Sequence, residues 1–295
     1  MNSFRTWDTR LLQLIGYLFV GFMGLFALFP FVMLLVSSFS SESYILRNGY
    51  TLWPAELSFD AYSYIFKDAA QVFSSYKISI FVTAGGTAIS LLLSSMAAYV
   101  LYRKEVRCRN ALAFYLFFTT LFNGGLAPYY IMISNYLHLK NTIWVLLLTP
   151  MFNVLYILIL RSFIKGAIPD ALVESAKMDG AGDLRIFGRI VLPLLKPALA
   201  SIGLFIALGY WNDWWTSMMF VEKPGLYPLQ YLLYRMLSFV NISDQFSEHV
   251  SSYIVLPKET FKLALTVVAT GPILLVYPFV QKYFVSGVTI GAVKG

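Results

Sequence analysis

Six long apolar blocks dominate the sequence and set the main limit on how the chain can fold. Each block has roughly 19 to 26 residues, and a helix of that length, at about 1.5 Å per residue, crosses a hydrocarbon core of about 30 Å. Hydrophobic residues make up 58% of the chain and charged residues only 13%, which excludes an ordinary soluble enzyme. We therefore predict an all-α polytopic membrane protein, one domain over residues 1–295, with about six transmembrane helices at Leu11–Val36, Ile78–Tyr102, Ala111–Ile133, Thr142–Leu160, Ala198–Val221 and Leu263–Phe284.

The first block follows Arg5 and Arg10, as the apolar core of a signal peptide would. Its length of about 26 residues is too great for such a core, and no small-residue cleavage pattern follows it. We expect it to be a retained span.

The net charge of +7 reflects basic residues placed between the apolar blocks. If the N-terminus is inside the cell, 14 of the 22 Lys and Arg residues lie on the cytoplasmic side, four of them between Arg103 and Arg109. Positive residues concentrate in cytoplasmic loops, so we predict that both termini are cytoplasmic and that the charge serves topology rather than nucleic-acid binding. Cys108, beside two arginines, is interpreted as an inert cytoplasmic thiol.

Two predicted external loops are long, at 37–77 and 222–262. The second contains an apolar stretch, YPLQYLLYRMLSFV, that carries Arg235 and is too short to span. An amphipathic segment at the outer face and simple loop packing both explain it.

The predicted cytoplasmic loop 168–193 has the pattern of two short helices. Pro169 and Asp170 suit the start of the first helix, and Gly180 suits its end. Asp183 suits the cap of a second helix that Pro193 ends. A docking helix and an ordinary connector are both compatible with this pattern.

The loop contains the motif E-S-A-x-x-D-G-A, with Glu174, Ser175, Ala176, Asp179, Gly180 and Ala181. This motif resembles the EAA loop of ABC-importer permeases, in which Ala usually stands at the position of Ser175. In that family the loop forms the coupling helix, which sits in a cleft of the cytoplasmic ATPase.

Further motifs are NGGLAPYY at 123–130, HLKNT at 138–142, WNDWWTSMMF at 211–220 and the closing GAVKG at 291–295. They are similar to those of the carbohydrate-uptake, maltose-type family, and of its LplC-like branch in particular. The resemblance implies a type I ABC-importer permease fold and import of an oligosaccharide, with polysaccharide- and uronate-derived sugars among the candidates. It implies that the tail with Lys282 and Lys294 reaches the ATPase.

The resemblance also implies partners: a second permease subunit in a heterodimer, a cytoplasmic ABC ATPase dimer, an extracellular or lipid-anchored sugar-binding protein, and membrane lipid. This chain has no P-loop motif, so we expect no cofactor and no catalysis within it, with ATP and magnesium bound by the ATPase.

Polar residues inside the fifth block, Trp211, Asn212, Asp213 and Trp214, are candidates for a sugar path, because amides and flat aromatic faces both suit sugars. An interfacial aromatic belt explains them equally. Tyr210 and Asn123 are weaker candidates.

An ion-coupled secondary transporter of a small polar solute is the alternative function. Such proteins place ionisable pairs at the middle of the membrane and show two related halves. The EAA-like loop argues against it.

Overall fold

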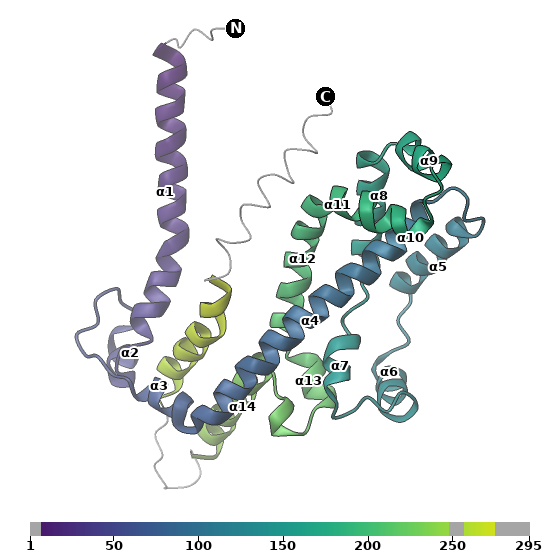
Figure 1. The fold of residues 1–295 in the computed structure, drawn as a ribbon. Coiled ribbons are helices and arrows are strands. Elements are labelled where there is room, and N and C mark those ends of the chain that lie inside the picture. The colour runs from purple at the N-terminus through teal and green to yellow at the C-terminus, as the bar shows by residue number, and fades with distance from the viewer. Residues whose placement is uncertain (1–6, 248–256, 275–295) are drawn as a thin grey trace. The chain divides into compact units, whose positions relative to one another are not determined.

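The computed structural model describes residues 7–247 and 257–274 (Figure 1). The described residues are helical apart from turns, loops and one isolated bridge between Ser40 and Leu57, which confirms the all-α prediction. The chain divides into two compact units, residues 1–69 with 235–271 and residues 70–234 with 272–295.

The first unit contains the long helix α1 (Trp7–Ser37), which buries none of its most apolar stretch in this chain. The short helices α2 (Glu42–Asn48) and α3 (Asp60–Ile65) and the 3₁₀ turn η1 (Phe66–Asp68) follow it. The Glu42 carboxylate accepts hydrogen bonds from the backbone N–H groups of Glu259 and Thr260, each at 2.9 Å. It therefore caps the start of the helix at 258–274.

Two helices form the centre of the second unit, α4 (Ala69–Tyr102) and α12 (Lys196–Trp211). The buried face of α4 is mostly small or hydroxylated, with Ser75, Ser79, Gly86, Ser90 and Ser94 recurring every four to seven residues. Small residues let two helices approach closely within a membrane. A Cβ at Gly86 would lie only 2.4 Å from the Tyr210 ring, so Gly86 is the point at which α12 packs onto α4.

The third predicted span is wrong as a continuous helix. It consists of α5 (Arg109–Leu121) and α6 (Leu126–Ile131), with a bend of 116° at the break, and a π-helical segment η2 (Met132–Tyr136) follows. The cause is local, because Gly125 has φ +88° and the Asn123 side chain accepts a hydrogen bond from its N–H at 2.9 Å.

The fourth and fifth predicted spans are also broken. The fourth is α7 (Ile143–Leu148) and α8 (Val154–Ala167), interrupted around Pro150, and Asn153 caps α8. The fifth is α12 and α13 (Trp215–Phe220), where the Asp213 carboxylate accepts from the Thr216 N–H at 3.0 Å. In both breaks a side chain binds a backbone N–H at the start of the second helix, inside an apolar stretch, which a hydropathy average cannot detect.

Within residues 7–247 and 257–274, two helices are long and apolar enough to cross a membrane, Arg10–Ser37 and Asp60–Tyr102. Two further pairs qualify if each bent pair counts as one span. The sixth predicted block begins in the helix at 258–274, and its remainder lies outside the described residues, as do Lys282, Lys294 and GAVKG. The apolar segment after Tyr227 is helical, in α14 (Leu229–Ser247), after the 3₁₀ turn η4 (Pro224–Leu226).

Gly86→Ala should destabilise the protein, because the new methyl group meets a ring that the Tyr210 hydroxyl anchors to the Leu147 carbonyl at 2.7 Å. Overpacking of this kind costs roughly 1 to 3 kcal/mol. Gly209→Ala is the matched control, because a Cβ there meets nothing within 4 Å. Thermal unfolding in detergent should show a lower midpoint for Gly86→Ala alone, and equal midpoints would contradict this account of the α4–α12 packing.

Candidate functional site

The candidate site begins with α9 (Asp170–Met178), which matches the first helix predicted in the loop 168–193. The backbone conformation at the end of α9 accounts for the sequence Asp179-Gly180-Ala181. Gly180 has φ +79°, its N–H donates to the Lys177 carbonyl at 2.9 Å, and the Ala181 N–H donates to the Ala176 carbonyl at 2.9 Å. This pair of bonds is a Schellman motif, which needs the left-handed conformation that glycine adopts most readily.

The second predicted helix is longer than expected and starts differently. It runs over Asp183–Leu194 as α10 (Asp183–Ile186), the π-helical segment η3 (Phe187–Val191) and α11 (Leu192–Leu194). Gly182 occupies the cap position and Asp183 lies in the first turn, so the predicted capping role of Asp183 is wrong. Pro193 lies inside α11, and α12 follows at a bend of 79°.

One surface of these helices is exposed and partly apolar. The Met178 and Leu184 side chains are 84% and 79% exposed, and Leu172 is also exposed. Glu174, Ser175, Asp179 and Gly180 are exposed beside them, while Ala176 and Ala181 are half-buried. Large exposed apolar side chains rimmed by polar residues mark an interaction surface.

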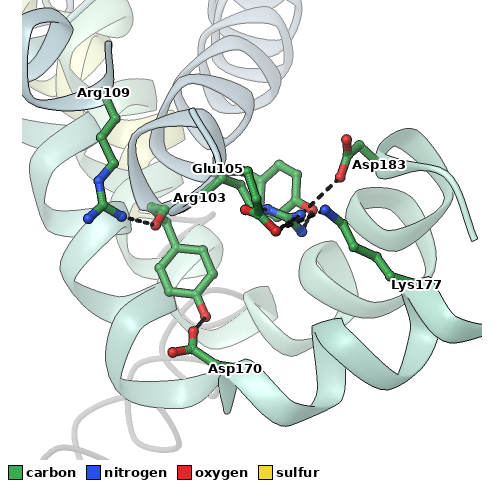
Figure 2. A network of polar contacts seen from close by, with 8 residues as sticks. Arg103, Glu105, Arg109, Asp170, Lys177 and Asp183 are labelled. Carbon is green, nitrogen blue, oxygen red and sulfur yellow. Dashed lines mark hydrogen bonds and ion pairs between the residues drawn. The ribbon is translucent and has the colours of Figure 1, made fainter. Parts of the chain in front are cut away.

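The helix α9 is also attached to the loop that follows α4 (Figure 2). Arg103 forms an ion pair with Asp183 at 3.3 Å, Glu105 with Lys177 at 2.9 Å, and Lys104 with Asp170. We call these six residues the clasp. They come from two segments that the charge count predicted to lie on the same side of the membrane.

Arg103 is the centre of the clasp and is only 6% exposed. Its guanidinium donates to both carboxylate oxygens of Glu105, at 3.0 and 2.8 Å, and to the Tyr99 hydroxyl at 2.8 Å. Paired hydrogen bonds between arginine and a carboxylate are among the strongest polar contacts in proteins. The Tyr99 ring in turn packs on Phe187 at 5.6 Å, so the last turn of α4 also contacts η3.

Two carboxyl groups of the clasp, those of Glu105 and Asp170, have lowered pKa values. The hydrogen bond from Lys177, with further ones from a backbone N–H and from Arg103, lowers the pKa of Glu105 to about 2. Lys104 and the Tyr102 hydroxyl lower the pKa of Asp170. Because a lowered carboxyl pKa favours the folded state above its ordinary value, the contribution of Glu105 is present above about pH 4.5 and is lost only toward pH 2.

A cavity of about 310 Å³ opens between this loop and α9. Its lining combines carboxylates with basic and aromatic groups: Tyr102, Arg103, Lys104, Glu105, Asp170, Val173 and Glu174. Within residues 7–247 and 257–274, no three metal-ligating side chains gather at one point.

The predicted sugar-path residues have structural contacts of their own. The Asn212 amide donates to the Leu208 carbonyl at 2.9 Å and accepts from Gln230 at 3.3 Å, and Asp213 caps α13. Trp211 is buried, whereas Trp214 is exposed and stacks on Tyr234 at 4.4 Å between ring centroids. The structure thus brings Asn212 and Trp214 to an accessible position and gives Asp213 a role in the backbone turn.

The two weaker candidates have similar local roles. Tyr210 is buried, and its hydroxyl donates to Leu147. Asn123 binds the Gly125 N–H at the break between α5 and α6.

The HLKNT motif forms a second attachment that the sequence did not reveal. Asn141 adopts a left-handed conformation, with φ +60°, and its side-chain oxygen accepts from the N–H groups of Glu222 and Lys223 at 2.6 and 3.3 Å. Lys140 also pairs with Glu222 at 2.6 Å. The motif therefore ties the segment after α13 to the loop before α7.

The clasp was also missed, although a signal for it was present. The loop after α4 is basic and the loop 168–193 carries four Asp and Glu residues, so their charges are complementary as well as informative about topology. Complementary charges on two loops predicted on the same side indicate a contact.

Comparison with known proteins identifies the family. Residues 86–290 match the model of the family described as "Binding-protein-dependent transport system inner membrane component". The chain belongs to this family.

Individual relatives agree with the assignment. The chain is 38% identical to the polygalacturonan/rhamnogalacturonan transport system permease protein YtcP of Bacillus subtilis, over 97% of this chain and 99% of that protein. It is 35% identical to protein LplC of the same organism, over 97% and 96% of the two chains.

A solved structure also matches, that of a bacterial ABC transporter involved in the import of the acidic polysaccharide alginate. The TM-score is 0.76 at 29% identity, over 96% of this chain and 100% of that chain. These matches confirm the ABC-importer permease fold and favour an ABC permease over an ion-coupled transporter. They also place the protein in the cytoplasmic membrane with other importer components as partners.

Proposed function

We propose that this chain is the permease subunit through which an ATP-driven importer moves an oligosaccharide carrying uronic acid residues. The support is that YtcP, at 38% identity, is a polygalacturonan/rhamnogalacturonan permease, and that the matching structure belongs to an importer of an acidic polysaccharide. Two relatives with acidic sugars favour a carboxylate-bearing substrate over a neutral one.

A second permease subunit completes the pathway in a heterodimer, and a sugar-binding protein outside the cell delivers the substrate. Both termini and the loop 168–193 face the cytoplasm in this proposal. An ATPase dimer binds ATP and magnesium there, and its closure moves the two permease subunits between inward-open and outward-open states.

The ATPase docks on the exposed surface of α9 and α10 described above. Met178 and Leu184 supply apolar contact, and Glu174 supplies a charge. Small side chains at Ser175 and Ala176 and the tight Gly180 turn permit close approach.

Reconstitution tests the proposal. Proteoliposomes containing this chain, the second permease subunit and the ATPase should import an oligogalacturonate or a similar acidic oligosaccharide when ATP and the binding protein are supplied.

Glu174→Ala should assemble in the membrane at the parent level yet lose most of its stimulation of ATP hydrolysis, because a docking charge is gone. Arg107→Ala, an exposed charge outside the docking surface, is the control. Parent-like stimulation by Glu174→Ala would contradict the docking role, and uptake driven by an ion gradient without ATP would contradict the importer.

Asn212 and Trp214 test the sugar path in the same assay. If they line it, Asn212→Ala and Trp214→Ala should lower uptake per assembled complex, because each removes a contact to the sugar. Such a contact contributes roughly 1 to 3 kcal/mol, a five- to two-hundred-fold change in apparent affinity. Asp213→Ala is the comparator, because loss of its cap should reduce abundance or thermal stability rather than uptake per molecule. If Asn212→Ala and Trp214→Ala both leave the uptake per assembled complex unchanged, the sugar-path interpretation is wrong and the aromatic-belt interpretation stands.

A further inference from the structure

We infer that the clasp makes α4 move as one body with the docking helices α9 and α10, so that α4 carries their displacement to the far side of the protein. This inference rests on the proposed docking of an ATPase at α9 and α10. The clasp residues are positioning residues, because they act through the helices they join and contact neither sugar nor nucleotide.

Chain connectivity links the docking helices to some helices and not to α4. The helix α8 precedes the docking helices along the chain, and α12 follows them after η3 and α11, so any displacement of α9 or α10 reaches both through the backbone. By contrast, α4 ends at Tyr102, far from the docking helices in sequence, and depends on side chains for its attachment.

The clasp contacts are spread along the docking helices. The clasp joins the docking helices at three points, Asp170 at the start of α9, Lys177 in its last turn, and Asp183 in the first turn of α10. Asp170 and Lys177 are about 10 Å apart along the helix axis. Three attachment points that do not lie on one line fix the orientation of a body as well as its position.

The clasp is stiffer than a set of separate surface ion pairs. A single exposed ion pair contributes little, because solvent screens it and long side chains lose entropy. Here Glu105, bound to Lys177, and Asp183 share the buried Arg103 guanidinium, which also lies 5.5 Å from the centre of the Tyr99 ring. The Tyr102 hydroxyl adds a bond to Asp170 at 2.6 Å, so two residues in the last turn of α4 hold the clasp.

The other end of α4 is also attached to a neighbouring segment. This helix has 34 residues and no proline, which gives a rod of about 50 Å. The Gln71 amide donates to the Pro224 carbonyl at 2.8 Å, and the Ser79 hydroxyl accepts from the Leu229 N–H at 2.7 Å. The far part of α4 therefore holds the segment between α13 and α14, and a displacement at the clasp reaches that segment.

A distance measurement tests the rigid attachment without any substrate. Spin labels are placed at Val100 and Gly188 in a Cys108→Ser background, since both positions are exposed and a Cβ at Gly188 meets nothing within 4 Å. In the complex with the ATPase, the parent should show one narrow distance distribution that ATP does not shift. Glu105→Gln should broaden the distribution or make it respond to ATP. A parent distance that shifts with ATP, or a Glu105→Gln distribution equal to the parent, would overturn the inference.

Transport efficiency gives the functional readout. Glu105→Gln and Lys177→Gln should each lower the amount of sugar imported per ATP hydrolysed by roughly two- to fivefold, the range that ion pairs of this kind support. Lys177→Arg should restore the parent ratio because it keeps the pair, and Arg107→Gln, in the same loop, should leave the ratio unchanged. An unchanged ratio in both Gln variants would overturn the inference. Absence of sugar uptake by the parent would count against the proposed function, and the spin-label distances would still decide the clasp.

Discussion

The contact between Tyr210 and Gly86 sets how closely the two central helices of the second unit approach. The ring occupies the space that any side chain at position 86 would need, and its hydroxyl satisfies the carbonyl at the end of α7. The Ser90 hydroxyl, one turn along α4, binds the Met151 carbonyl in the break that follows α7. A break in a membrane helix leaves backbone groups that water cannot reach, so neighbouring side chains must bind them. The small and hydroxylated face of α4 therefore serves both close packing and satisfaction of the broken segment.

Hydropathy was sufficient to predict an all-α membrane protein, because apolar length is a property of each segment alone. The ends of α9 were predictable for the same reason, since Pro169 and Gly180 act locally. The breaks were not predicted, although Asn123, Gly125 and Pro150 are visible, because an average over an apolar block hides a few breaking residues.

The clasp and the Asn141 attachment lie beyond what spacing can show. Each joins residues roughly 70 to 80 positions apart, and the fold decides which charges meet. The predicted role of Asp183 illustrates the difference. Its position near a helix start was read correctly, but its carboxylate pairs with Arg103 rather than capping the helix. A residue with a good local explanation can have a long-range partner instead.

In this account the docking helices have two sets of side chains with separate tasks. One set is exposed and apolar, with Met178 and Leu184, and receives the ATPase. Asp170, Lys177 and Asp183 carry the charges of the clasp and pass the motion to α4. Glu174 lies between the two sets, because it also lines the cavity beside the clasp. Because different side chains serve the two tasks, a variant at Met178 or Leu184 can disturb docking without changing the clasp, and a variant at Lys177 can do the reverse.

Cross-linking tests the central claim most directly, because it locates the ATPase on the chain. A photo-reactive amino acid placed at Met178 or Leu184 in the assembled importer should form a covalent product with the ATPase subunit on illumination. The same amino acid at Phe114, an exposed residue of α5, is the control and should form none. No product from Met178 and Leu184, or an equal yield from Phe114, would contradict docking at α9 and α10.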